Sequence, residues 1–560
     1  MSGPNSANRP AKFSRRDFLF FSIAMASTLG FARWQNIFGN SKNKFQLKRK
    51  IPGSIKGASS QVGHLIRESQ QLVPTREKSV SVAIVGSGIS GLSAGWWLDR
   101  HGFKDFHIFE LENKFGGNSQ SDGNEISRYP WGAHYLPIPN PNAEFVIELL
   151  KEAGVITGKN LKGQYIYKDE FLCHDPKERL FMEGHWQDNL VPGTGLSETE
   201  NKEIRAFIKM MEGYENRKGS DGKPVFTLPI AHCSQDPLFL KLDDLSMAQF
   251  LDSQSLKCKP LRWYVDYCCL DDYGARADKI SAWMGIQYFA SRTGEAANAE
   301  SNSVLTWPEG NGWLVNYLQG RIGDRMTSGA LVTSIEVHKD RAEILSLDVR
   351  TKELTKIKCE KVIYAAPRFT APYVIKDNLN NKRLSPSPME YDPWMVANIT
   401  LDSRPGGDGA PLSWDNVSYH TSSLGYIVAN HQNLEQPKSE TVVTLYWPLV
   451  DASPTEERKR ALLKSHEEWV QQIAQELEAL HPGIESSIRN IDVWIWGHAM
   501  ARPAPGIIWG SARRTMHESI GKILHFAHSD MSGYSVFEEA QYWGVEAAKK
   551  ILASGSKKHG

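Results

Sequence analysis

The sequence has few cysteines, no long apolar run and almost no net charge, and each absence excludes a class of protein. Its six cysteines, at positions 173, 233, 258, 268, 269 and 359, show no Cys-x-x-Cys spacing, so neither a zinc site nor a redox dithiol is predicted. No run of about eighteen apolar residues occurs, which argues against an ordinary membrane-spanning helix. The net charge is +1 and no basic face stands out beyond the N-terminal region, so nucleic acid is not expected as a partner.

The sequence is instead long and rich in apolar material. Its 560 residues are too many for one simple core, so we expect two domains. An apolar fraction of 41% and 17 tryptophans indicate a globular protein with large cores or pockets.

The N-terminus carries an export pattern. The run Ser14-Arg15-Arg16-Asp17-Phe18-Leu19, followed by a moderately apolar segment, matches bacterial twin-arginine signals; the alternative is a surface arginine pair before a short helix. We expect residues 1–32 to form a signal segment that engages the twin-arginine translocase and directs the protein to the periplasm. An uncleaved segment would tether it to the inner membrane. Residues 33–78 are polar and basic and predict a linker and an arm.

The rest of the chain is organised around residues 80–118. The apolar run from Val82 to Val85 predicts a buried parallel strand, and a helix with an apolar period follows it. Between them lies a Gly-x-Gly-x-x-Gly turn at positions 86, 88 and 91, which lets a pyrophosphate approach the helix N-terminus. Glu110 ends a second strand 24 positions after Gly86, where an acid accepts hydrogen bonds from an adenosine ribose. A bare glycine turn would leave Glu110 unexplained, so we predict a dinucleotide site.

A second glycine pair indicates which dinucleotide. The stretch Glu110-x5-Gly116-Gly117-Asn118 resembles the flavin-binding signature of the FAD-dependent amine oxidase and phytoene desaturase superfamily. In that superfamily the acid holds the ribose and the glycine pair lies against the pyrophosphate. The resemblance implies FAD as the cofactor. It is expected to be non-covalent, because no cysteine after Cys359 is available for the C-terminal attachment seen in some relatives.

Later segments resemble the same superfamily. Gly132-Ala133 matches the turn that passes the flavin ring, and Val332 matches a valine whose backbone contacts the adenine. Asp530 matches the acid that binds the ribityl chain, although His528-Ser529 stands where a glycine usually precedes it. The residues that the resemblance assigns to the cofactor are Gly86, Ser87, Gly88, Ile89, Ser90, Gly91, Glu110, Leu111, Gly116, Gly117, Asn118, Gly132, Ala133, His134, Val332, Asp530 and Phe537.

The implied fold class is α/β, with a Rossmann-like, GR2-type FAD-binding domain of the amine-oxidase kind beside a mixed α+β substrate domain. We expect the FAD-binding domain to be assembled from residues 79–137, 305–370 and 488–553. The substrate domain would comprise residues 138–304 and 371–487. Within it, the pattern from Pro454 to Leu480 predicts one long helix.

Four residues are candidates for chemistry. Hydride acceptance by a flavin needs the substrate over the ring in a dry pocket, and aromatic walls supply one. Trp494 and Trp496 share one face of a predicted strand, which either lines the pocket or packs into the core. Asp272, in the pair Asp271-Asp272, is a recruitment site for a cationic amine or, more often, a helix cap or solvated residue. His134 is a proton relay or a structural histidine.

The resemblance implies an FAD-dependent oxidoreductase that oxidises an amine, a polyamine or an amino acid, by hydride transfer to flavin N5. Residues 391–401 correspond to a strand that carries a lysine near N5 in many amine oxidases, and they contain no lysine. That departure weakens the case for oxygen as electron acceptor and makes a quinone or an electron carrier as plausible. The alternatives are a desaturase or isomerase of an isoprenoid-like apolar substrate, and a flavin-binding partner protein without turnover.

Overall fold

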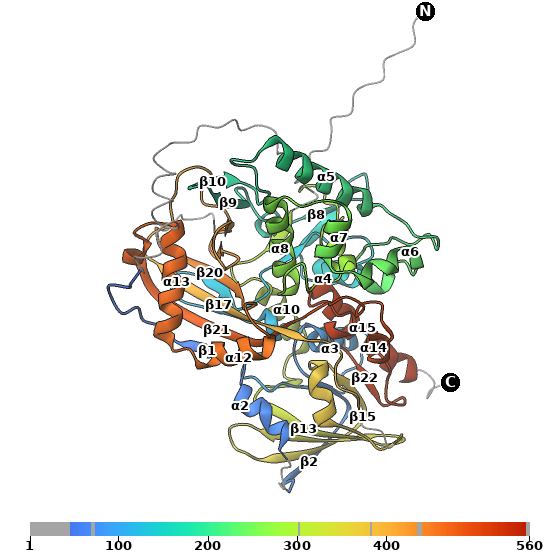
Figure 1. Cartoon of the computed structure of the whole chain (residues 1–560). Helices are drawn as coiled ribbons and strands as arrows, with labels where there is room; N and C mark the ends of the chain where they lie inside the picture. The colour runs from blue at the N-terminus through green and yellow to red at the C-terminus, as the bar shows by residue number, and fades with distance from the viewer. Residues whose placement is uncertain (1–44, 69–72, 301–302, 381–383, 434–438, 556–560) are drawn as a thin grey trace, which may run out of the picture.

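The computed structural model describes residues 45–68, 73–300, 303–380, 384–433 and 439–555. The predicted twin-arginine segment, residues 1–32, lies outside these ranges. Two β-sheets occupy different ends of the molecule, with helices between and around them (Figure 1). Within the described ranges no helix is both long enough and apolar enough to cross a membrane.

The first sheet is assembled from segments that lie far apart in the chain. Its strand order is β12, β3, β2, β15, β14, β13 and β16, and β22 also pairs with β15. The pairs β2–β3, β2–β15 and β15–β22 are parallel, whereas β13, β14 and β15 form an antiparallel ribbon. The bounds are β2 Arg76–Val85, β3 Phe106–Phe109, β12 Met326–Thr327, β13 Ala330–Val337, β14 Ala342–Asp348, β15 Leu354–Tyr364, β16 Ile375–Asp377 and β22 Leu524–Phe526.

Helices α3 (Ile89–Arg100), α10 (Gly312–Ile322) and α15 (Phe537–Gly555) pack beside this sheet. Leu92, Trp96 and Leu98 of α3 are fully buried, because α3 lies between the sheet and its helical neighbours. A Cβ on Gly95 would come within 3.1 Å of the side chains of both Ile108 and Ile322, so close helix packing requires glycine there. The predicted strand at Val82–Val85 is confirmed, and it begins earlier than expected, at Arg76.

The second sheet has the order β1, β21, β17, β20, β19, β18, β9, β10. Helix α13 covers one face, where its Trp469 and Ile473 share a core with Met395 and Val443. Helix α8 covers the other, where Cys268 shares a core with Trp394. The bounds are β1 Ile55–Gly57, β9 Glu178–Met182, β10 His185–Asp188, β17 Tyr391–Leu401, β18 Asp415–Ser418, β19 Tyr426–Val428, β20 Thr441–Pro448, β21 Ile488–Ala501, α8 Lys259–Tyr273, α12 Pro454–Leu463 and α13 His466–Leu480.

Helices gather beyond that second face, at the top of Figure 1. They include α5 Glu198–Glu215, α6 Pro237–Leu240, α7 Met247–Ser253 and α9 Ala282–Ala290. The remaining elements are α2 Ser60–Gly63, α4 Glu144–Glu152, α11 Ala371–Val374, α14 Ser511–Thr515, β4 Ser121–Gly123, β5 Arg128–Pro130, β6 Tyr135–Pro137, β7 Ile156–Lys159, β8 Tyr165–Tyr167 and β11 Val304–Thr306.

The prediction of one helix from Pro454 to Leu480 is wrong. The chain forms α12 and α13, and the break falls at Lys464-Ser465. Ser465 causes the break, because its side chain accepts the N–H of Glu468 and caps a new helix. Part of the expected arm is also ordered structure: Ile55–Gly57 pair in parallel with β21 and extend the second sheet.

Candidate functional site

The glycine turn between β2 and α3 leaves room for a ligand at the helix N-terminus. Gly86 has a φ of +99°, and its N–H donates to the carbonyl of Phe109 at 2.9 Å. A Cβ on Gly91 would lie 1.9 Å from the carbonyl oxygen of Gly86, so only glycine fits there. A Cβ on Gly88, in contrast, would meet no atom within 4 Å. The space that Gly88 faces, just before the first turn of α3, is therefore open, whereas Ile89 and Ser90 of that turn are buried.

Glu110 stands next to this turn, at the end of β3. The N–H and Oγ of Ser87 donate to one of its carboxylate oxygens at 2.8 and 2.6 Å, and the N–H of Glu112 donates to the other at 2.9 Å. Burial raises the pKa of this carboxyl. The acid is fixed in position by these donors, and the oxygen that accepts only the Glu112 N–H keeps an acceptor site for a further hydroxyl donor such as that of a ribose.

The loop that contains Gly116 and Gly117 packs against the Gly86–Gly91 turn. Gly116 and Gly117 have φ values of +113° and +56°, and the N–H of Gly116 donates to the Ser87 carbonyl at 3.0 Å. A Cβ on Gly117 would lie 3.2 Å from the Cα of Gly88. The two loops thus touch at glycines, which leaves their backbone N–H groups, and not side chains, nearest to a ligand.

Asn118 links these loops to the second sheet. Its side-chain amide donates to the carbonyl of Ala499 at 2.7 Å, and its own carbonyl accepts the N–H of Ala133 at 3.0 Å. A Cβ on Gly132 would lie 2.3 Å from the Asn118 carbonyl oxygen. The Gly132-Ala133 turn therefore packs directly against the loop that carries Gly116, Gly117 and Asn118.

Asp530 is buried in a 3-10 turn that follows β22, at the other end of the chain. Its Oδ2 accepts the N–H of Arg368 at 2.8 Å and the hydroxyl of Tyr391 at 2.7 Å. The Nδ1 of His528 lies 3.1 Å from both the backbone nitrogen and Oδ1 of Asp530, and the neutral tautomer that accepts the Asp530 N–H has no proton at Nδ1 to donate to Oδ1. Oδ1 has no hydrogen-bond partner among the described residues. A buried acceptor without a donor fits a ligand that carries hydroxyl groups, as a ribityl chain does.

Of three other expected cofactor contacts, Val332 and Phe537 are buried and Leu111 is half-buried. Val332 lies in β13, two residues after Ala330, whose N–H donates to the Glu110 carbonyl at 2.7 Å. Leu111 follows Glu110 and packs with the cluster of Leu331. Phe537 begins α15.

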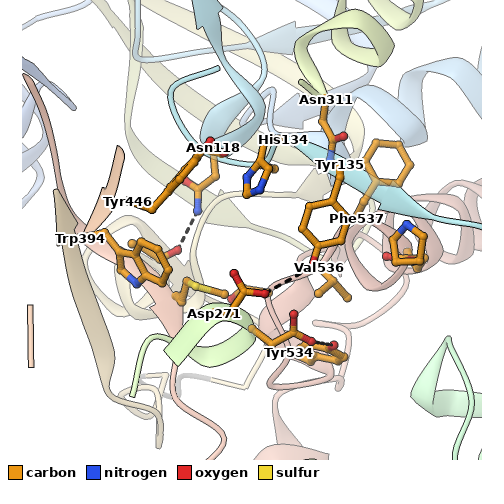
Figure 2. A pocket seen from close by; sticks show the side chains of 18 of the residues that line it. Asn118, His134, Tyr135, Asp271, Asn311, Trp394, Tyr446, Tyr534, Val536 and Phe537 are labelled. Carbon is orange, nitrogen blue, oxygen red and sulfur yellow. Dashed lines mark hydrogen bonds between the residues drawn. The ribbon is translucent and has the colours of Figure 1, made fainter. Parts of the chain in front are cut away.

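A cavity of about 950 Å³ adjoins the Gly132-Ala133 turn and the start of α15. Figure 2 shows His134, Tyr135, Asp271, Trp394 and Tyr446 around one space. The cavity wall comprises Asn118, Gly132, Ala133, His134, Tyr135, Pro137, Leu228, Asp271, Asp272, Arg292, Asn311, Trp394, Val396, Tyr446, Trp496, Ala499, Met500, Tyr534, Ser535, Val536, Phe537 and Glu538.

Three of the four residues predicted for chemistry lie in this wall, namely His134, Asp272 and Trp496. Trp494 does not line it; its ring packs 5.2 Å from that of Trp131 and 5.1 Å from that of Trp496. Trp496 is held by its Nε1, which donates to the Trp131 carbonyl at 2.6 Å.

His134 is a neutral member of the wall. Its ring stacks on Tyr446 at 4.5 Å, and burial lowers its pKa to about 4. It therefore adds no positive charge at neutral pH. An aromatic wall without a charged histidine can accommodate either a cation or an apolar group.

The two neighbouring aspartates differ. Asp272 is bound to the guanidinium of Arg292 and accepts the hydroxyl of Tyr534 at 2.6 Å, so its charge is neutralised inside the wall. The carboxylate of Asp271 accepts the hydroxyl of Tyr135 at 3.4 Å. The partners of the two carboxylates therefore differ: Asp271 contacts Tyr135, whereas Asp272 contacts Arg292 and Tyr534.

Several wall residues were not among the predicted ones, including Arg292, Trp394, Tyr446, Tyr534 and Glu538. Glu538 offered a signal, since it is one of two adjacent acids at the start of an apolar helix. Burial raises the pKa of Glu538 and of Glu539 to about 7. Trp394 lay within the lysine-free stretch, but nothing local marked it as a cavity residue.

Comparisons with known proteins agree with this arrangement. Residues 84–153 match the family model of an NAD(P)-binding Rossmann-like domain. A 47-residue stretch is 51% identical to the acrylate reductase flavoprotein subunit of Shewanella woodyi, and it covers 8% of this chain and 9% of that protein. The chain therefore spans under a tenth of that relative.

Solved structures match over most of the chain. A putrescine oxidase with putrescine bound has a TM-score of 0.60 at 17% identity, covering 85% of this chain and 100% of that one. Cyclohexylamine oxidase from Brevibacterium oxydans IH-35A has a TM-score of 0.60 at 15% identity, and the match covers 85% of this chain and 99% of that one. A CLA-producing fatty acid isomerase from P. acnes has a TM-score of 0.58 at 15% identity, and the match covers 84% of this chain and 99% of that one. The predicted α/β fold class with a Rossmann-like unit is confirmed.

Proposed function

Because the chain has the fold of the FAD-dependent amine oxidase superfamily and resembles flavoprotein oxidoreductases, we propose that it oxidises an amine by hydride transfer to a non-covalently bound FAD. One observation carries the proposal. The aromatic cavity that holds Asp271 directly adjoins the Gly132-Ala133 turn and the start of α15, so a substrate site and a nucleotide site share one wall.

The residues fit the cofactor. Three features support a dinucleotide with hydroxyl groups as the ligand: the open face at Gly88, the fixed acid Glu110 and the Oδ1 of Asp530. A bound flavin supplies hydride acceptance. Glu110 favours FAD over a mononucleotide, because its partner would be the adenosine ribose. None of the six cysteines lines the cavity within the described residues, which supports a non-covalent cofactor.

The cavity suits an amine. Asp271 supplies a carboxylate that attracts a cationic substrate, and the neutral His134 does not oppose it. The rings of Trp394, Tyr446 and Trp496 exclude water from the reacting carbon. Asp271 is also placed to hold the proton that an ammonium group must lose before it is oxidised.

The proposal includes export to the periplasm and an electron acceptor other than oxygen. The run Ser14–Leu19 supports passage through the twin-arginine translocase to the periplasm. The cavity wall contains no lysine among the described residues, which supports a quinone or an electron carrier as acceptor.

The experiment is an anaerobic absorbance titration of the purified protein with polyamines, amino acids and isoprenoids. An amine is expected to bleach the flavin, and an added quinone to restore the colour. Asp271→Asn should slow bleaching by roughly tenfold or more while leaving dithionite reduction unchanged. Asp278→Asn, at an exposed position, is the matched control. A colourless protein that takes up no FAD, or a flavin that no amine bleaches, would overturn the proposal.

A second candidate is an isomerase or desaturase of an apolar substrate. The apolar members of the wall, among them Leu228, Val396, Met500 and Val536, favour it. Turnover of an isoprenoid without any bleaching by amines would select this candidate.

A further inference from the structure

The turn that follows β15 brings an arginine to the edge of the first sheet at which the glycine turn lies. Because β15 pairs in parallel with both β2 and β22, the carboxyl ends of these three strands meet at one edge. A Cβ on Gly86, after β2, would lie 3.0 Å from the carbonyl oxygen of Ala365, after β15. The N–H of Arg368 donates to Oδ2 of Asp530, after β22, at 2.8 Å. The turn 365–368 therefore touches the glycine turn at one end and Asp530 at the other.

The guanidinium of Arg368 is buried and lacks acceptors. The residue is 6% exposed, and neither its Nε nor its Nη1 has a hydrogen-bond partner among the described residues. The guanidinium carbon lies 4.1 Å from the ring centre of Phe526, which packs against the group without accepting these N–H groups in its plane. A buried charge is costly unless it is paired and hydrogen-bonded. The two nitrogens therefore point to an acceptor that the described part of the chain does not supply.

Two other arginines are buried in the described ranges, and both have acceptors. Arg179 donates from Nε to Oδ1 of Asn416 at 2.6 Å and from Nη1 to the carbonyl of Ala410 at 3.0 Å. Arg513 donates from Nε and from Nη1 to two backbone carbonyls. The lack of acceptors is thus particular to Arg368 and does not follow from burial in this fold.

Asp530 only partly offsets the buried charge. Burial lowers the pKa of the Arg368 guanidinium, and the attraction of nearby groups, Asp530 among them, opposes this shift without cancelling it. Oδ2 of Asp530 already accepts the N–H of Arg368 and the hydroxyl of Tyr391. Its Oδ1 has no hydrogen-bond partner among the described residues. Neighbouring side chains at this edge thus hold two unmatched donors and one unmatched acceptor.

The ligand expected at this edge carries negative charge. The pyrophosphate of FAD has two anionic phosphates with several acceptor oxygens. The residues that the sequence assigns to the cofactor include no lysine or arginine, and the glycine turn offers the phosphates only backbone N–H groups. A guanidinium suits phosphate oxygens, because its N–H groups lie in one plane and can donate in pairs.

We propose that Arg368 is the cation that pairs with the pyrophosphate of FAD, with Nε and Nη1 as donors, while Oδ1 of Asp530 accepts a hydroxyl of the same ligand. The inference rests on the cofactor of the proposed function, and it assigns to that cofactor a residue that the sequence motifs did not mark. Arg368 binds the nucleotide and takes no part in hydride transfer.

The first test measures flavin release from the purified holoprotein after dilution, by the rise in flavin fluorescence. Arg368→Met should release flavin at least about tenfold faster than the wild type, because hydrogen bonds to a charged group are lost. Arg368→Lys keeps the charge with a different donor geometry, so its rate should fall between the two. Arg179→Met and Arg179→Lys, which change a buried guanidinium in the second sheet, are the matched controls and should release flavin as the wild type does.

Phosphorus NMR of the bound FAD gives a second readout, which a merely structural role would not move. Each Arg368 variant should shift at least one of the two phosphorus resonances, and the Arg179 variants should leave both in place. Unchanged resonances in Arg368→Lys would overturn the assignment whatever the release rate, and this variant decides the matter if Arg368→Met does not fold. That result would leave amine oxidation intact, whereas a purified protein without flavin would overturn both proposals.

Discussion

Both carboxylate oxygens of Asp272 accept hydrogen bonds from one guanidinium nitrogen of Arg292, at 2.6 and 2.8 Å. The side chain of Asp272 is 4% exposed and that of Arg292 is 18% exposed. The pair lies in the cavity wall, and the hydroxyl of Tyr534 donates to Asp272 and links the pair to the loop before α15. The aspartate that the sequence put forward for substrate recruitment is thus paired with Arg292 inside the cavity wall.

Asp272→Asn should destabilise the protein by about 3–5 kcal/mol, because it leaves Arg292 buried without its counter-charge. Urea unfolding measures the loss, and Asp271→Asn is the matched control, with an expected loss below about 1 kcal/mol. Adding Arg292→Met to Asp272→Asn should restore part of the stability. Equal stability of Asp272→Asn and wild type would contradict the assigned ion pair.

Gly88→Ala should fold as the wild type does and bind flavin at least about tenfold more weakly. The added methyl meets no protein atom within 4 Å, so only a ligand over the turn can oppose it. Flavin fluorescence quenching measures the affinity. Gly320→Ala in α10, where a Cβ also meets nothing, is the control and should bind flavin normally. Unchanged affinity in Gly88→Ala would remove the nucleotide from this turn.

Glu110→Gln should weaken FAD binding by roughly tenfold and FMN binding much less, because FMN has no adenosine ribose. Three protein donors already point at this carboxylate, and a glutamine amide cannot accept all of them. Titrating both flavins by calorimetry gives the ratio. An equal loss for FAD and FMN would mean that the residue supports the fold of the turn and not the adenosine.

Stability should fall as pH rises from about 5 to about 7, through Glu538 and Glu539. Burial raises the pKa of both carboxyls from about 4.5 to about 7, so in this window the folded state keeps protons that the unfolded state has released. Each carboxyl then contributes a loss of about 1 kcal/mol per pH unit. Urea unfolding at several pH values tests this. Glu538→Gln/Glu539→Gln should flatten the profile, whereas Glu546→Gln, on the same helix, should leave its slope in place.

Local backbone requirements made part of the site predictable from sequence. Gly86, Gly88 and Gly91 each answer a steric demand of the strand-to-helix turn, and Glu110 follows at the spacing which that unit imposes. Asp530 was predicted only from the resemblance, and the pairing of β22 with β15 brings its segment back to the first sheet. The helix break at Ser465 was readable too, since Ser465 and Glu468 form a capping box, but the strong helical pattern on both sides hid it.

The sequence by itself determined the α/β nucleotide unit, because the turn, the acid and the glycine pair all lie in one continuous segment, residues 86–117. Only the tertiary structure decided which side chains face the cavity. Trp494 and Trp496 share a strand face, yet their positions along β21 put one against Trp131 and the other in the wall. Asp271 and Asp272 diverge because successive helical residues point in different directions, and Arg292, just after α9, binds Asp272. Such pairings depend on contacts between distant segments, which no local pattern encodes.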